Sequence, residues 1–177
     1  DILPTVIHSS YRMTYNNVNK ILDGDQKLQQ EYAPAVPLFF LMQELATLLR
    51  KVRDERGAID FDVDEAKVLV DKQGKPTDVV LRQRGESDRI IESFMLVANE
   101  TVAKHFKWLD LPFIYRVHEQ PKVKKLQQFV NIVKPLGYTI KGSLEHVYPN
   151  ELNAIIHASK GTDEHVIVST LLLRCMQ

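Results

Sequence analysis

The sequence has few of the features that mark disulfide-stabilised, membrane or secreted proteins. A single cysteine, Cys175, stands among its 177 residues, so the chain forms no internal disulfide and fits a reducing compartment. No apolar run approaches the roughly 20 residues that span a bilayer. The first residues lack the basic and apolar stretches of a signal peptide. We therefore expect a cytoplasmic protein with no membrane partner.

Neither sign of charge is in excess. Lys+Arg and Asp+Glu both number 23, and the formal net charge is +0. This balance argues against a globally basic nucleic-acid-binding surface, although local basic patches stay open. Hydrophobic residues make up 44% and charged residues 26%, which excludes a disordered chain because enough apolar surface is present to offset the ordering entropy. The length is that of one domain.

The two ends of the sequence differ from those of most natural proteins. The chain has no initiator Met, and residues 166–176 are apolar almost to the last residue. Termini usually lie in polar, frayed sequence. We therefore expect a piece of a larger protein. Apolar surface around Phe39–Phe40 and 166–175 is expected to be exposed and to favour self-association.

Apolar periodicity predicts an α+β chain that is predominantly helical. Two long helices are expected over Pro37–Arg56 and Ser87–Trp108, with Ser87 as the N-cap of the second. A β-hairpin is predicted across Gly74, and 113–117 is predicted to be a short strand. Shorter helices are expected after a Thr14 N-cap to Leu22, and over Pro121–Val133, Asn150–Ala158 and Asp163–Cys175.

Three possible chemical sites are weak. Alternating carboxylates follow the first long helix: Asp60, Asp62 and Asp64. An EF-hand would need Gly and Glu where the chain has Glu65 and Asp71, so a solvated strand edge is favoured. The six histidines do not pair at zinc-helix spacing, and no metal site is predicted from them. Cys175 lies in an apolar helical run, which predicts an inert thiol.

Two polar side chains share one face of the second long helix. Glu92 lies inside the apolar stretch 90–95, and Asn99 follows two turns later on nearly the same face, at about 100° per residue. Polar groups on an apolar helix need partners. The two are either hydrogen-bonded structural groups or a polar stripe that faces a ligand channel, and periodicity favours neither.

The segment 115–121 contains a second polar pair. Arg116 and His118 would point to the same side of an extended chain, where they could bind phosphate or pair with acids, the latter being slightly favoured. A small basic patch follows, which suits either solvent or a phosphate backbone. It consists of Lys122, Lys124 and Lys125.

Several motifs, in the same order along the chain, resemble those of the RNase II/RNase R superfamily. Residues 53–61 (RDERGAIDF) resemble a segment of this family that ends in an aromatic residue. Residues 91–99 (IESFMLVAN) resemble the family's signature helix, and residues 115–121 (YRVHEQP) resemble the signature motif that follows this helix. Segments 10–15, 24–34 and 171–177 are also similar to bacterial members. The resemblance implies the central part of an RNB catalytic domain, truncated at both ends, without the cold-shock and S1 domains of the parent protein.

By this resemblance the parent is an enzyme, a processive 3′-to-5′ exoribonuclease. It would hydrolyse single-stranded RNA, not DNA, to nucleoside 5′-monophosphates, with RNA threaded through a channel and its bases stacked on aromatics. A cluster of aspartates would hold the magnesium that activates water. These aspartates and a stacking tyrosine are expected before Asp1, and a catalytic arginine after Gln177. The fragment alone is therefore expected to lack a cofactor and to be inactive.

The resemblance also implies roles for individual residues. Phe61 matches the aromatic that stacks on terminal bases. Glu92 matches the acid near the terminal sugar, where a carboxylate can accept a hydrogen bond from a 2′-hydroxyl. Ser93 stands where a second acid is usual, which leaves the role of that acid open. The further RNA-binding candidates in the matched motifs are Asn99, Arg116 and His118. Asp60, Asp62 and Asp64 do not match the catalytic aspartates.

Two other functions stay open. The chain could belong to a non-catalytic relative that binds RNA or a protein through the same fold, or to a helical interaction domain with no role in RNA. An aspartate cluster upstream of Asp1 would indicate the enzyme, and the absence of any RNA effect in the intact protein would indicate the interaction domain.

Overall fold

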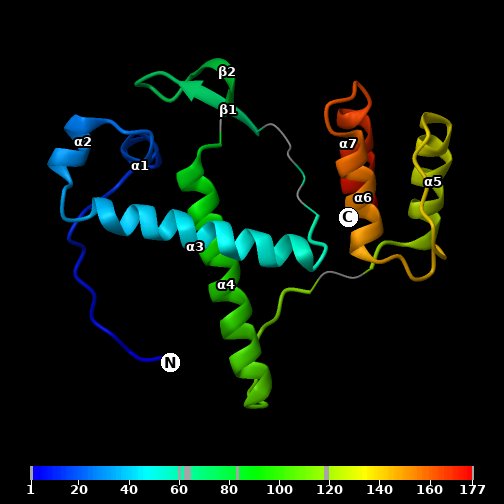
Figure 1. Cartoon of the computed structure of the whole chain (residues 1–177), viewed down its shortest axis with the longest axis horizontal. Helices are drawn as coiled ribbons and strands as arrows, with labels where there is room; N and C mark the ends of the chain where they lie inside the picture. Colours follow the sequence, from blue (N-terminus) through cyan, green and yellow to red (C-terminus); the bar gives the residue numbers. More distant parts are fainter. Residues whose placement is uncertain (1, 60, 62–64, 83, 118–119, 177) are drawn as a thin grey trace. The chain divides into compact units, whose positions relative to one another are not determined.

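The computed structural model describes residues 2–59, 61, 65–82, 84–117 and 120–176. These residues form mainly α-helices together with a two-stranded antiparallel sheet, so the predicted α+β, predominantly helical class is confirmed (Figure 1). The chain divides into two compact units. Of the described residues, those in 1–49 and 84–102 belong to unit 1, and those in 50–83 and 103–177 belong to unit 2.

Unit 1 contains the whole of α1 (Tyr15–Leu22) and α2 (Gln26–Glu31). It also contains the larger parts of α3 (Val36–Glu55) and α4 (Glu86–Trp108). The bounds of α3 and α4 agree with the two predicted long helices to within one residue at each end. Helix α1 begins as predicted, because the side chain of Thr14 accepts a hydrogen bond from the Asn17 N–H at 3.2 Å. Helix α2 was not predicted, and Asp25 caps it through the Leu28 N–H at 3.1 Å.

The connected core of unit 1 is small. Ile21, Ala35 and Phe39 are buried together, and partly buried apolar side chains of α1, α2 and the start of α3 pack against them. Phe39 is therefore covered, whereas its neighbour Phe40 is exposed. The expectation of exposed apolar surface at this point is right for Phe40 and wrong for Phe39, because the two side chains lie on different faces of α3.

The predicted β-hairpin across Gly74 is confirmed, and it belongs to unit 2. Strand β1 (Glu65–Val70) pairs antiparallel with β2 (Pro76–Arg82), and Val68 lies opposite Val79. In the turn, Asp71 Oδ1 accepts hydrogen bonds from the N–H groups of Gln73 and Lys75, both at 2.9 Å. Gly74 has a φ of +80°, a left-handed conformation that glycine adopts without a Cβ penalty.

The larger core belongs to three helices of unit 2: α5 (Val123–Val133), α6 (Pro149–Ser159) and α7 (His165–Cys175), with the 3₁₀ turn η1 (Lys134–Leu136) after α5. Helix α7 packs against both α5 and α6 (Figure 1). Side chains three and four residues apart on each helix fill the core. The buried set is Leu126, Phe129, Val133, Leu152, Ile155, Ile156, Val168, Leu172 and Cys175. The expectation of exposed apolar surface over 166–175 is therefore right for Val166 and Ile167 and wrong for the three α7 residues of this core, because they face α5 and α6.

Two local predictions are wrong. Helix α4 begins at Glu86, so Ser87 lies inside the first turn and is not its N-cap. Residues 113–117 form no strand, because a strand needs a hydrogen-bonded neighbour and none pairs with this segment in the described part of the chain. The Phe113 ring instead stacks on Phe106, with centroids 4.5 Å apart and an interplanar angle of 15°.

Among the described helices, none combines the length and the apolar character that crossing a membrane requires.

Candidate nucleic-acid interface

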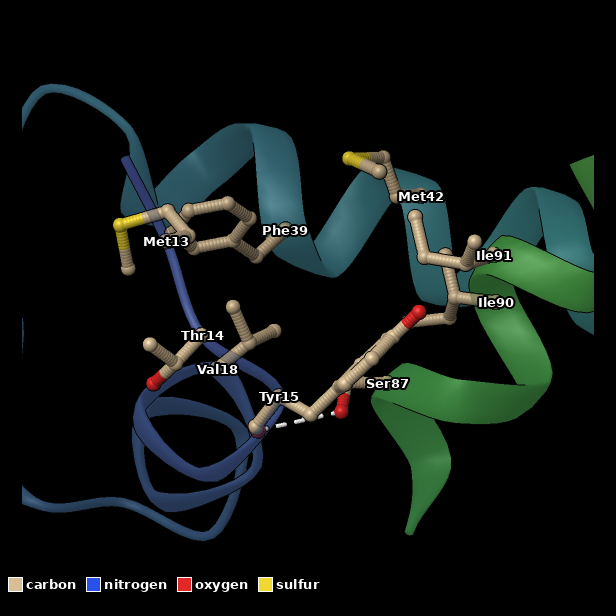
Figure 2. Close-up of a pocket in the computed structure, with 9 residues that line it drawn as sticks. All are labelled: Met13, Thr14, Tyr15, Val18, Phe39, Met42, Ser87, Ile90 and Ile91. Atoms are coloured by element: carbon tan, nitrogen blue, oxygen red, sulfur yellow. Dashed lines mark hydrogen bonds between the residues drawn. The ribbon is translucent and has the colours of Figure 1, made fainter. Parts of the chain in front are cut away.

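The first turn of α4 is fixed to α1 by hydrogen bonds between residues that lie far apart in the sequence. The Ser87 N–H donates to Asn19 Oδ1 at 2.9 Å. Ser87 Oγ donates to the backbone oxygen of Tyr15 at 3.1 Å, the bond marked in Figure 2. Within the turn, the Gly85 N–H donates to Asp88 Oδ2 at 3.1 Å. These bonds satisfy donors that a helix N-terminus leaves unpaired. They also fix the first turn of α4 beside α1.

Glu92, in the second turn of α4, forms an ion pair with Arg84, which lies two residues before the helix. Arg84 Nη2 donates to Glu92 Oε2 at 2.5 Å. The side chains are 30% exposed for Arg84 and 39% exposed for Glu92. The carboxylate is hydrogen-bonded to the protein, as expected of a structural group. It is also accessible from solvent, as expected of a residue that faces a ligand channel.

The neighbouring candidates on α4 differ in exposure. Asn99 lies two turns after Glu92 and is exposed. Ser93 is buried, and its hydroxyl donates to the backbone oxygen of Arg89 at 2.8 Å. A charged carboxylate at such a buried position would need a partner. The hydroxyl of Ser93 is satisfied by its own helix.

An apolar hollow of about 520 Å³ lies beside the start of α4 in unit 1 (Figure 2). Helix α3 contributes Phe39 and Met42, and α4 contributes Ile90 and Ile91. The other lining residues are Met13, Thr14, Tyr15, Val18 and Ser87. None of these described residues carries a charge, so the hollow suits an apolar group and not a phosphate.

Phe61 is a candidate in unit 2. Its ring is partly buried and packs against the core formed by α5, α6 and α7. Neither Ile59 nor Phe61 lies in a strand. Asp60, Asp62 and Asp64 lie outside the described residues, so the strand edge favoured for these carboxylates stays a prediction. Because the ring touches the core, a substitution at Phe61 affects stability as well as any contact with a base.

Arg116 is exposed in the segment 111–117, which has no regular secondary structure. A row of aromatic rings precedes it, since Phe113 contacts both Phe106 and Tyr115, the latter at a centroid distance of 5.3 Å. An exposed guanidinium suits a phosphate contact. His118, the other candidate of this motif, lies outside the described residues. The structure therefore places Glu92 and Asn99 on one helix of unit 1, and Phe61 and Arg116 in unit 2.

Among the described residues, neither Cys175 nor the metal-ligating side chains form a further site. Burial raises the pKa of the Cys175 thiol, and the charge of Lys125 opposes this effect. The thiol also donates to the backbone oxygen of Lys125 at 3.4 Å. These observations agree with an inert thiol. In the described part of the chain, no three His, Cys, Asp or Glu side chains lie close enough to hold a metal ion.

Sequence reasoning missed Arg84 and Asn19. Arg84 lies outside the helix and eight residues before Glu92, so the helical spacings of three and four residues do not connect the pair. Asn19 is 68 residues from Ser87 in the sequence, and no local pattern indicates that it binds the start of another helix.

The family model of the RNB domain matches residues 1–177. Ribonuclease R 1 of Lactococcus lactis is 43% identical over 176 residues, which cover 99% of this chain and 22% of that protein. Ribonuclease R of Thermotoga maritima is 40% identical over 178 residues, covering 100% of this chain and 25% of that protein. The chain thus spans about a quarter of the length of these relatives.

Solved structures show the same similarity. Mycoplasma genitalium RNase R in complex with ribose methylated single-stranded RNA has a TM-score of 0.78 and 28% identity, covering 92% of this chain and 25% of that one. The same protein in complex with double-stranded RNA has a TM-score of 0.78, covering 92% of this chain and 29% of that one. The resemblance carried by the sequence motifs is confirmed. On the match over its full length, the chain belongs to the RNB domain family.

Proposed function

We propose that this chain is part of a processive 3′-to-5′ exoribonuclease that hydrolyses single-stranded RNA to nucleoside 5′-monophosphates. The match of the RNB domain over residues 1–177 carries this proposal. The names of the similar proteins, ribonuclease R, support it, as does the similar structure that holds single-stranded RNA. The substrate and the small number of thiols accord with a cytoplasmic enzyme.

We propose further that residues 1–177 are one part of an RNB catalytic domain, and that any cold-shock and S1 domains lie elsewhere in the protein. The share of the relatives that the chain covers, 22% and 25%, supports this division.

Glu92 is our candidate for contact with the ribose at the 3′ end. Its carboxylate is an acceptor without a donor of its own, and the 2′-hydroxyl that distinguishes RNA from DNA is a donor. Its 39% exposure leaves room for such a contact. Asn99, exposed two turns later on α4, continues the polar stripe along the helix.

Three residues outside this stripe complete the proposed RNA contacts. The partly exposed ring of Phe61 would stack on a base. Arg116 is exposed and would contact a phosphate. His118 stays in the proposal on the strength of its motif alone.

The magnesium that the resemblance implies does not fit the described residues of this chain, since no three ligating side chains come together there. On the family resemblance, we propose that the aspartates that hold magnesium and the catalytic arginine are not among residues 1–177.

The test uses the full-length protein and a single-stranded RNA labelled at its 5′ end. We expect the full-length RNA to be converted to a short 5′-labelled end product with few intermediates, as processive shortening from the 3′ end requires, together with release of nucleoside 5′-monophosphates. We also expect loss of activity on chelation of magnesium and no degradation of the matching DNA. Binding of the RNA without hydrolysis in magnesium or manganese would contradict the proposal and indicate a non-catalytic RNA-binding protein. The 177-residue chain alone should release no mononucleotides.

A further inference from the structure

The ion pair between Arg84 and Glu92 restricts a side chain that would otherwise be flexible. A glutamate on an exposed helix face samples several rotamers, and each rotamer directs the carboxylate differently. Here Arg84 Nη2 binds Glu92 Oε2 at 2.5 Å, and both side chains are partly covered. A guanidinium presents its donors in a rigid plane, so it orients a carboxylate as well as attracting it.

Arg84 is itself attached to a well-anchored segment. The next residue, Gly85, donates its N–H to Asp88, and Ser87 binds both Asn19 and Tyr15 of α1. Gly85 also lies so close to α1 that a Cβ at this position would be 2.1 Å from Asn19 Nδ2. The backbone beside Arg84 is therefore fixed on both the α1 side and the α4 side.

From this arrangement we infer that Arg84 is a positioning residue, which holds the Glu92 carboxylate in the orientation that accepts a hydrogen bond from the terminal 2′-hydroxyl. The inference rests on the proposed function, because it needs Glu92 to contact the ribose. It assigns Arg84 a role in the choice of sugar and not in binding phosphate. A terminal deoxynucleotide lacks the 2′-hydroxyl but keeps its phosphate. Loss of a role in the choice of sugar should therefore impair the reaction of the ribose-ended RNA more than that of the deoxyribose-ended RNA, whereas loss of a phosphate contact should impair both equally.

The experiment measures kcat/KM of the full-length protein on two RNA oligonucleotides that differ only in the sugar of the 3′-terminal nucleotide, ribose or 2′-deoxyribose. The ratio of the two values is the ribose preference. We expect Glu92→Gln to lower this preference about tenfold, the order expected for loss of a hydrogen bond to a charged group. Arg84→Met should lower it nearly as much, and Arg84→Lys should recover part of it.

Arg89→Met is the matched control. Arg89 is an exposed arginine in the first turn of α4, and it pairs with Glu86 Oε2 at 3.7 Å. Its replacement removes the same charge and should leave the ribose preference unchanged. If Arg84→Met does not fold, Arg84→Gln, which keeps a hydrogen-bond donor, should fold and show an intermediate preference.

An unchanged ribose preference in Arg84→Met, beside a lowered one in Glu92→Gln, overturns the inference and leaves Glu92 as the ribose contact without Arg84. If kcat/KM of Arg84→Met also falls equally on both substrates, Arg84 acts in phosphate binding or in stability. A Glu92→Gln enzyme with unchanged preference would overturn the ribose contact itself, while a wild-type protein without exonuclease activity would overturn the proposed function.

Discussion

The two units of the chain are stabilised in different ways. In unit 2, nine buried side chains from α5, α6 and α7 form one connected core. In unit 1 the connected core contains three buried side chains, an apolar hollow of about 520 Å³ lies beside it, and polar bonds from α1 hold the start of α4. Glu92 thus lies on a helix whose start is held by specific polar contacts, whereas the helices of unit 2 are held together by packing.

Helix α3 shows the same contrast between its faces. Phe39 and Ala46 are buried on one face. Another face carries an exposed row of leucines at spacings of three and four residues, as in a helix-packing seam. The row consists of Leu38, Leu41, Leu45 and Leu48. Unit 1 therefore exposes a surface of the kind that usually packs against another helix.

The largest expected effect tests the difference in packing. Phe129→Ala should lower the free energy of unfolding by about 3–5 kcal/mol, because the ring is fully enclosed in the core of unit 2. Phe39→Ala should cost less, since the Phe39 ring already borders the hollow. Chemical denaturation of the full-length protein measures both losses, and hydrogen exchange assigns them to a unit. An equal or larger loss at Phe39 would contradict the comparison.

The next effect concerns Phe61, which touches the unit 2 core and is also a candidate for stacking. Phe61→Leu keeps an apolar side chain and removes the aromatic face. We expect RNA binding to weaken by about 1–3 kcal/mol, with a loss of stability below about 1.5 kcal/mol. Titration with single-stranded RNA and thermal melting give the two values. A large drop in melting temperature with unchanged RNA affinity and unchanged final product length would make Phe61 a core residue only.

A smaller effect is expected at the contact between α1 and α4. Asn19→Ala removes the acceptor for the Ser87 N–H and should cost about 1 kcal/mol of stability, as the loss of a helix cap does. The control is Asn16→Ala, because Asn16 is exposed on the same helix and should tolerate the change within about 0.5 kcal/mol. Equal stability of the two variants in denaturant titrations would show that the long-range cap does not hold α4.

The smallest effect on stability belongs to the exposed leucine row. Leu41→Gln should change the unfolding free energy of the 177-residue chain by less than about 0.5 kcal/mol, because the side chain is exposed. We propose that this row supports self-association of the 177-residue chain, so the variant should associate less strongly in sedimentation velocity. A chain that is monomeric with or without the substitution would contradict the proposal.

Local signals in the sequence were sufficient for most of the secondary structure. The apolar spacing along α3 and α4 and the Gly74 turn predicted those elements to within a residue or two, because helical periodicity and left-handed turns depend on nearby residues. The strand predicted at 113–117 is absent from the described part of the chain, because strand formation depends on residues that are distant in the sequence. Whether this segment pairs as a strand depends on a neighbour that its own residues do not determine.

The candidate site was predictable only in part. The motif around Glu92 identified the carboxylate, and its helix placed Asn99 on nearly the same side. The partners that fix it, Arg84 before the helix and Asn19 on α1, come from loop geometry and from a contact across 68 residues. Neither follows a helical or strand period, so the sequence pattern carried no signal for them.

The central claim is that Glu92 recognises the terminal ribose of RNA, and a double-mutant cycle tests it most directly. The cycle combines Glu92→Gln in the full-length protein with removal of the 2′-hydroxyl from the 3′-terminal nucleotide, and it measures the binding free energy of all four pairs under conditions that prevent hydrolysis. The account predicts a coupling energy of about 1 kcal/mol or more between the carboxylate and the hydroxyl. Additive effects, with a coupling energy near zero, would contradict it.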